Sequence, residues 1–120
     1  MSSPEGSALE GIRVLEVSDG SAGYCGKLLA DLGADVIKIE PPGGDPSRLE
    51  PPFAGATAGP DRGLGFLYVN ANKRSVVLDL SEESDRGRFH RLAGSAALIV
   101  ESLPPGQLDS WDLGFESLRA

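Results

Sequence analysis

The chain has 120 residues, 40% of them hydrophobic, with 11 Lys and Arg against 18 Asp and Glu and a net charge of -7. This length permits one domain, and the composition is that of a folded globular protein, which argues against intrinsic disorder. Because an acidic chain repels nucleic acid and anionic lipid, a ligand that carries phosphate has to be held by local donors.

The number of cysteines and the N-terminal residues exclude further classes of protein. Cys25 is the only cysteine and His90 the only histidine, so the sequence predicts neither an internal disulfide nor a metal site. Residues 1–11 lack the basic and apolar regions of a secretory signal, and no apolar run approaches the roughly 20 residues that span a bilayer. We therefore expect a cytoplasmic protein.

The first third of the sequence predicts a strand–helix–strand unit. Alternating aliphatic residues indicate a strand over Arg13–Val17, followed by a turn of small residues at 18–23, a helix over 24–32 and a second strand over 35–39. The apolar residues of the helix recur at the spacing of one face, which we expect to be buried: Cys25, Leu28, Leu29 and Leu32. Two parallel strands joined by a helix are the expected product.

The turn at 18–23 lies where open parallel sheets bind ligands, beyond a strand's carboxyl end and at a helix N-terminus. Its glycines, Gly20 and Gly23, are three apart, whereas the dinucleotide fingerprint places its first two glycines two apart. Glu40 does end the second strand, as a ribose-binding carboxylate would. A nicotinamide or flavin site and a simple tight turn therefore both stay open from these residues.

The middle of the chain is rich in proline. Residues 40–60 hold six of the nine prolines and show no periodicity, which predicts an extended, partly ordered segment lying over a site or a partner. The short apolar run at 63–69 fits either a helix or a strand.

The last third predicts a second strand–helix–strand unit. We expect a strand over 75–80, a helix from an N-cap at Ser81 to about Ala93, and a fully buried strand at 96–100. The inner face of this helix should carry Phe89, Leu92 and Ala93, and short helical turns should follow at 108–111 and 115–118. The fold class is α/β, a Rossmann-like parallel sheet with flanking helices that is incomplete, because another strand would normally follow. We expect marginal stability for this reason.

Few side chains predict chemistry by themselves. His90 sits within a helix and is expected to be packed or solvated, and Cys25 is expected to be a buried structural thiol. Ser21 lacks the sequence context of a serine nucleophile. Lys73 and Arg74 are the only adjacent basic pair, which fits either a phosphate contact or a solvated turn.

The ordered motifs resemble a known family over about residues 9–118. LEGIRVLEVS, SAGYCGKLLADLGADVIKIEPPGGDPSR, NANKRSVVLDL and ESLPPGQLDSWDLGFESL are similar to the N-terminal region of family III CoA-transferases, the group of formyl-CoA transferase, carnitine CoA-transferase and α-methylacyl-CoA racemase. The resemblance implies that residues 1–120 are the N-terminal, CoA-binding half of a Rossmann-like large domain. It also implies a CoA thioester and a carboxylic acid as substrates, and an intertwined homodimer of full-length subunits.

The resemblance implies a mechanism in which an aspartate attacks the thioester and forms a mixed anhydride. That aspartate lies beyond the position where this chain ends, so no residue here is assigned a catalytic role and we expect the chain alone to be inactive. An acyl-CoA racemase of the same family, a non-catalytic remnant and a nicotinamide-binding module remain alternatives.

The resemblance also places residues against coenzyme A by position. These are Ser21, Ala22, Pro41, Leu78, Asp79, Leu80, Ser102 and Leu103, with Lys73 and Arg74 near phosphate. The loop ESLPPG departs from the family's usual E-N-F-x-P-G, which removes an amide donor and an aromatic surface. The first turn is one residue shorter than the family's A-G-P-x-C, and Ser110 replaces a residue that is often basic.

Overall fold

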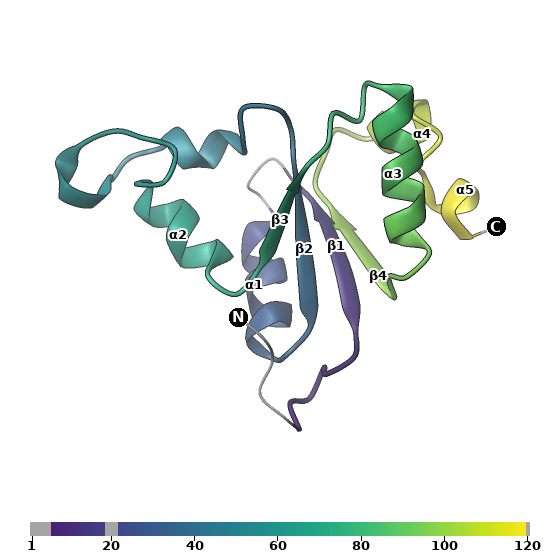
Figure 1. Cartoon of the computed structure of the whole chain (residues 1–120), viewed down its shortest axis with the longest axis horizontal. Coiled ribbons are helices and arrows are strands. Elements are labelled where there is room, and N and C mark those ends of the chain that lie inside the picture. The colour runs from purple at the N-terminus through teal and green to yellow at the C-terminus, as the bar shows by residue number, and fades with distance from the viewer. Residues whose placement is uncertain (1–5, 19–21, 120) are drawn as a thin grey trace.

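The computed structural model of this protein describes residues 6–18 and 22–119 (Figure 1). Its four strands are β1 (Arg13–Val17), β2 (Asp35–Glu40), β3 (Arg74–Val77) and β4 (Leu98–Glu101), and they form one parallel sheet in the order β3-β2-β1-β4. The expected α/β fold, a parallel sheet with flanking helices, is confirmed.

The described residues form seven helical elements beside the sheet. They are α1 (Gly23–Asp31), η1 (Pro46–Leu49), η2 (Ala54–Ala56), α2 (Leu64–Asn70), α3 (Glu83–Ala93), α4 (Gln107–Ser110) and α5 (Phe115–Arg119), of which η1 and η2 are 3-10 helices. Figure 1 shows α1 and α2 on one side of the sheet and α3, α4 and α5 on the other. Within residues 6–18 and 22–119, no helix has the length and apolarity to cross a membrane.

The register places the carboxyl ends of the strands at one edge. Val17 of β1 pairs with Glu101 of β4, and Glu40 of β2 pairs with Val77 of β3. The loops that follow the four strands therefore begin side by side, which is the arrangement that binds ligands in open parallel sheets.

The face toward α3 is an apolar core, as expected. Phe89 of α3 is fully buried, and Leu92 and Ala93 pack beside it, so the predicted inner face of this helix is confirmed. The buried members of this core are Leu15, Val17, Ile37, Ile39, Leu78, Leu80, Phe89 and Leu113. They alternate along β1 and β2, because successive side chains of a strand point to opposite faces.

The face toward α1 differs from the prediction. Cys25, Leu28 and Leu32 are exposed, and the buried residues of the helix are the small ones, Gly23, Gly26 and Ala30. The expectation of a buried thiol is therefore wrong, as is the expected burial of Leu28 and Leu32, whereas Leu29 is partly buried and packs against the apolar cluster on this face. The helix lies close to side chains of the sheet: a Cβ atom at Gly26 would overlap Glu16 Oε1. Only small residues fit at that approach.

The proline-rich segment is more regular than expected. It contains η1 and η2, and Phe53 forms an antiparallel bridge with Gly63. The run that fitted a helix or a strand is the helix α2.

Two details of the second half also differ. Helix α3 has Glu82 as its N-cap residue rather than Ser81, whose hydroxyl instead donates to Asp79 Oδ1 at 2.5 Å. Strand β4 was expected to be fully buried, but it lies at the edge of the sheet and Leu98 is 44% exposed. Burial from both faces and both neighbours is not available to an edge strand.

Candidate functional site

Most residues predicted to contact a ligand follow the carboxyl ends of the strands. Ala22 is the N-cap residue of α1, which follows β1, and Pro41 comes directly after β2. Three residues follow β3 and two follow β4: Leu78, Asp79, Leu80, Ser102 and Leu103. The amide of Ser102 donates to the carbonyl of Val17 at 3.0 Å, so the loop after β4 starts beside the turn after β1. Ser21 lies outside the described residues.

This edge offers backbone groups more than side chains. The side chains of Leu78 and Leu80 are buried in the core toward α3. The carboxylate of Asp79 accepts from the amide and hydroxyl of Ser81, and Pro41 is exposed. Leu103 packs against the same core while its amide donates to Glu101 Oε2 at 2.9 Å. A ligand here would meet main-chain atoms at the loops and the start of α1.

The basic pair lies at the start of β3: Lys73 precedes the strand and Arg74 is its first residue. Arg74 donates to the carboxylate of Asp35 at 2.9 and 2.7 Å, and Asp35 is the first residue of β2, so this ion pair lies toward the amino edge of the sheet. The Lys73 side chain is 1% exposed, and its Nζ lies 2.6 Å from Glu16 Oε1. Arg74 is thus held away from the loops of the carboxyl edge, whereas Lys73 reaches the carbonyl of Gly23 at the start of α1. The contact of either cation with phosphate stays a prediction.

A buried group of four charged side chains lies between the sheet and α1. In this group, called here the Glu16 network, Glu16 is fully buried, its Oε2 accepts from Lys38 Nζ at 2.8 Å, and its Oε1 forms an ion pair with Lys73 Nζ at 2.6 Å. Lys38 also lies 2.8 Å from Asp45, and Lys73 donates to the carbonyl of Gly23 at 2.9 Å. The network holds two acids and two bases, so its burial leaves no uncompensated charge.

The network shifts the acidities of its members. Burial by itself would lower the pKa of Lys38, but its hydrogen bonds to Asp45 and Glu16 outweigh burial and raise that pKa above the ordinary value. Burial opposes ionisation of Asp45 as well, but the hydrogen bonds from Lys38 and Ser47 lower the pKa of its carboxyl. For Lys73 burial is the larger effect, so its pKa falls despite the nearby Glu16.

A second buried carboxylate, Glu40, lies at the end of β2. Arg48 donates to both of its oxygens, from Nε at 2.7 Å and from a terminal nitrogen at 2.9 Å. The hydroxyl of Ser75 and the amide of Asp45 also donate to it. Hydrogen bonding from Arg48, more than any other cause, lowers the pKa of Glu40 to about 2. This carboxylate is therefore ionised at any physiological pH.

The pairing of these charged groups was not predicted from the sequence, although a signal was present. Glu16 and Lys38 are register partners in β1 and β2, and each occupies the fourth position of its strand. Opposite charges at matching positions of two neighbouring parallel strands indicate a cross-strand pair. The same alternation places Ser18 beside them, whose hydroxyl donates to Glu16 at 3.1 Å.

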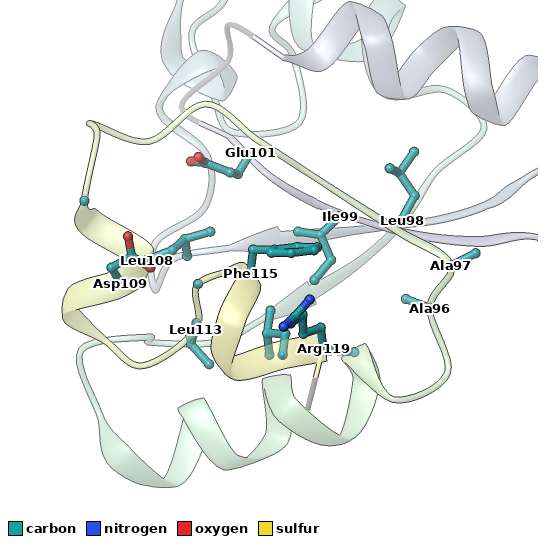
Figure 2. A pocket seen from close by; sticks show the side chains of 14 residues that line it. Ala96, Ala97, Leu98, Ile99, Glu101, Leu108, Asp109, Leu113, Phe115 and Arg119 are labelled. Carbon is teal, nitrogen blue, oxygen red and sulfur yellow. The ribbon is translucent and has the colours of Figure 1, made fainter.

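An open cavity of about 450 Å³ lies on the other side of the molecule, against the free edge of β4 (Figure 2). Figure 2 shows Ile99 of β4 facing Phe115 and Arg119 of α5 across it. Most of its lining is apolar, and Arg119 is paired with Glu116 at 3.0 Å. Among the described residues no three His, Cys, Asp or Glu side chains gather to hold a metal there or elsewhere. The cavity is separate from the loops that follow β1, β2 and β3.

Comparison with known proteins adds the family context. Residues 9–120 match the sequence profile of CoA-transferase family III. The chain is 44% identical over 115 residues to the succinyl-CoA:mesaconate CoA-transferase of Haloarcula hispanica, covering 93% of this chain and 28% of that protein. It is 42% identical over 106 residues to the succinyl-CoA:(R)-benzylsuccinate CoA-transferase subunit BbsE of Thauera aromatica, covering 88% and 26%.

Solved structures agree with these matches. A crystal structure of the protein Rv3272 from Mycobacterium tuberculosis superposes with a TM-score of 0.83 at 35% identity, covering 95% of this chain and 30% of that one. A CAIB/BAIF family protein from Brucella suis gives a TM-score of 0.82 at 35% identity, covering 94% and 30%. The chain thus spans less than a third of the length of these relatives.

Proposed function

Because this chain belongs to CoA-transferase family III, we propose that it forms the N-terminal, CoA-binding part of an enzyme that moves CoA from an acyl-CoA thioester to a carboxylic acid. One observation carries the proposal. The loops after β1 and β4 start side by side, tied by the hydrogen bond from Ser102 to Val17, and therefore offer one cradle at the carboxyl edge. Coenzyme A is long enough to cross several such loops.

The backbone supplies the binding groups in this proposal. Ala22 has no side-chain oxygen to cap α1, so the first amides of that helix are donors for an anionic group of CoA. Ser21, Pro41 and the loop residues Leu78, Asp79, Leu80, Ser102 and Leu103 contribute the remaining contacts. Lys73 acts on this site through the carbonyl of Gly23, the first residue of α1, to which it donates.

The proposed reaction proceeds by nucleophilic catalysis. A carboxylate attacks the thioester carbonyl, the bond to sulfur breaks, and CoA leaves as a thiolate while the acyl group forms a mixed anhydride with the enzyme. Three of the described aspartates form ion pairs with basic side chains. Asp31 pairs with Lys27, Asp35 with Arg13 and Arg74, and Asp45 with Lys38. We propose that the attacking aspartate is supplied by sequence outside these 120 residues and that the full-length subunits form a dimer.

Ligand titration of the chain tests the binding half of the proposal. Coenzyme A and succinyl-CoA, the donor named for several relatives, should each raise the melting temperature with increasing concentration, and NADH should not. A response to NADH without a response to either CoA compound would overturn the proposal in favour of a nicotinamide site.

A substitution at the start of α1 should change the stability of the helix and the affinity for CoA in opposite directions. Ala22→Asp adds a carboxylate at the N-terminus of α1, which should stabilise the helix by about 1 kcal/mol as an N-cap. The same carboxylate should weaken CoA binding, because it competes with the anionic ligand for the same amides. Ala97→Asp, an exposed alanine before β4 at the opposite edge of the sheet, is the matched control and should leave the affinity unchanged.

A further inference from the structure

The segment between β2 and α2, residues 41–63, has few apolar residues to hold it in place. None of the residues of η1 or η2 is buried, and the segment passes from the carboxyl edge of the sheet toward α2 (Figure 1). Long connections with few buried side chains are ordinarily mobile. Interactions other than apolar packing must therefore hold this segment in place.

Arg48, a residue of η1, contacts three other parts of the fold. Two of its nitrogens donate to Glu40 at the end of β2, and the third donates to the carbonyl of Pro60 at 3.1 Å and to Asp61 at 3.2 Å. Its guanidinium also lies 4.0 Å from the ring centre of Phe66, a buried residue of α2. A single side chain thus joins the sheet, η1, the loop before α2 and α2 itself.

The backbone packs tightly around this residue. A Cβ atom at Gly63 would lie 2.7 Å from the carbonyl oxygen of Arg48, and one at Gly44 would lie 2.9 Å from its Cδ atom. Asp45 adds a second fixed point, because it caps η1 through the amide of Ser47 and pairs with Lys38 of the sheet. Both ends of the segment therefore pack closely against Arg48, Gly44 against its side chain and Gly63 against its backbone carbonyl.

All three guanidinium nitrogens of Arg48 donate within the protein. These bonds use four of the five N–H groups of Arg48, so most of its hydrogen-bonding capacity goes to protein groups and its main effect on a ligand is indirect. Arginine is the residue suited to this task, because its planar fork binds both oxygens of a carboxylate while its face stacks on an aromatic ring.

We propose that Arg48 is a positioning residue that holds residues 41–63 as a fixed wall beside the loops of the carboxyl edge, and so places Pro41 against coenzyme A. The ligand part of this inference rests on the proposed function, whereas the ordering of the segment rests on the contacts of Arg48 alone. The experiment below measures the two parts separately.

Hydrogen exchange followed by mass spectrometry measures the ordering. Arg48→Met should accelerate exchange in peptides from residues 41–63 by about tenfold, the effect of losing roughly one charge-assisted hydrogen bond, and leave peptides of α3 unchanged. Arg48→Lys, which keeps one ion pair but neither the fork nor the stacking, should fall between Arg48→Met and the unsubstituted chain. Arg88→Met removes an exposed arginine of α3 that pairs with Asp85, and it is the control that should change nothing in residues 41–63.

Calorimetric titration with coenzyme A tests whether Arg48 places Pro41 against the ligand. Under conditions where each variant is fully folded, Arg48→Met should weaken CoA binding by about tenfold and Arg48→Lys should restore part of the affinity. If Arg48→Met fails to fold, hydrogen exchange and CoA affinity are both measured on Arg48→Lys instead. Unchanged exchange in residues 41–63, or faster exchange with unchanged CoA affinity, would overturn the role of Arg48. No CoA binding by the unsubstituted chain would instead reject the proposed function and the placing of Pro41, while the exchange data would still decide the ordering.

Discussion

The two faces of the sheet bury their side chains by different means. Toward α3 the strands contribute Leu15, Val17, Ile37 and Ile39 to an apolar core that centres on Phe89. Toward α1 the same strands contribute an apolar part near their amino ends and the Glu16 network nearer their carboxyl ends. The difference lies in adjacent residues, since Leu15 and Glu16 are both fully buried and point to opposite faces.

The comparison shows that buried side chains are stabilised by different interactions on the two faces. Apolar packing is non-directional, so the α3 face should accept other side chains of similar volume. Charges removed from water require partners at fixed distances, so the α1 face should be intolerant of the loss of a single member. The Glu16 network thus fixes the positions of the side chains that form it. It lies beside the start of α1 and beside η1, and both elements border the proposed site.

The largest expected effect comes from removing the centre of the network. Glu16→Met leaves Lys38 and Lys73 buried with one carboxylate fewer, which should reduce the free energy of unfolding by about 3–5 kcal/mol. Urea denaturation at pH 7 measures this. Adding Lys73→Met removes the one uncompensated charge and should recover most of the loss, because Lys38 keeps Asp45. A single variant as stable as the unsubstituted chain would show that the network is solvated rather than buried.

Acid should weaken the α1 face before the α3 face. The folded-state pKa of Glu40 is about 2 against an ordinary 4.5, so its stabilisation is complete above about pH 4.5 and is lost as pH falls toward 2. A shift of this size corresponds to about 3 kcal/mol. Denaturation of Glu40→Gln and of the unsubstituted chain should therefore differ at pH 7 and converge near pH 2. A constant difference across this range would contradict the assignment.

The next effect tests the close approach of α1 to the network. Gly26→Ala should cost about 1–3 kcal/mol, because the added methyl group overlaps a Glu16 oxygen that its two lysines hold in place. Gly65→Ala in α2 is the matched control: its added methyl group meets nothing, so it should be neutral or slightly stabilising. Equal thermal melting of the two variants would mean that α1 can move away from the sheet.

The smallest effect concerns the side of α1 that the sequence pattern predicts to be buried. Leu28 is 46% exposed, so Leu28→Ala should change the free energy of unfolding by no more than about 0.5 kcal/mol. Leu15→Ala on the α3 face should cost about 2–5 kcal/mol by the same measurement. A loss of that size for Leu28 would show that its face of the helix is covered in solution.

The sequence by itself determined the four strands, the helices α1 and α3, the inner face of α3 and the edge where the loops meet. These features depend on local periodicity and on the parallel direction that a helical connection imposes, and both can be seen in a short window of residues. The strand Arg13–Val17 and the residues Phe89, Leu92 and Ala93 were predicted on that basis.

Only the tertiary structure decided which side of α1 is buried, and which charges are paired. The apolar stripe of that helix indicated the wrong face, because Glu16 and Lys73 beneath it leave room only for Gly26. The partners of the buried charges are 22 residues apart for Glu16 and Lys38 and 8 residues apart for Glu40 and Arg48. Such pairs depend on strand register and loop path, which a periodic pattern within one segment does not contain.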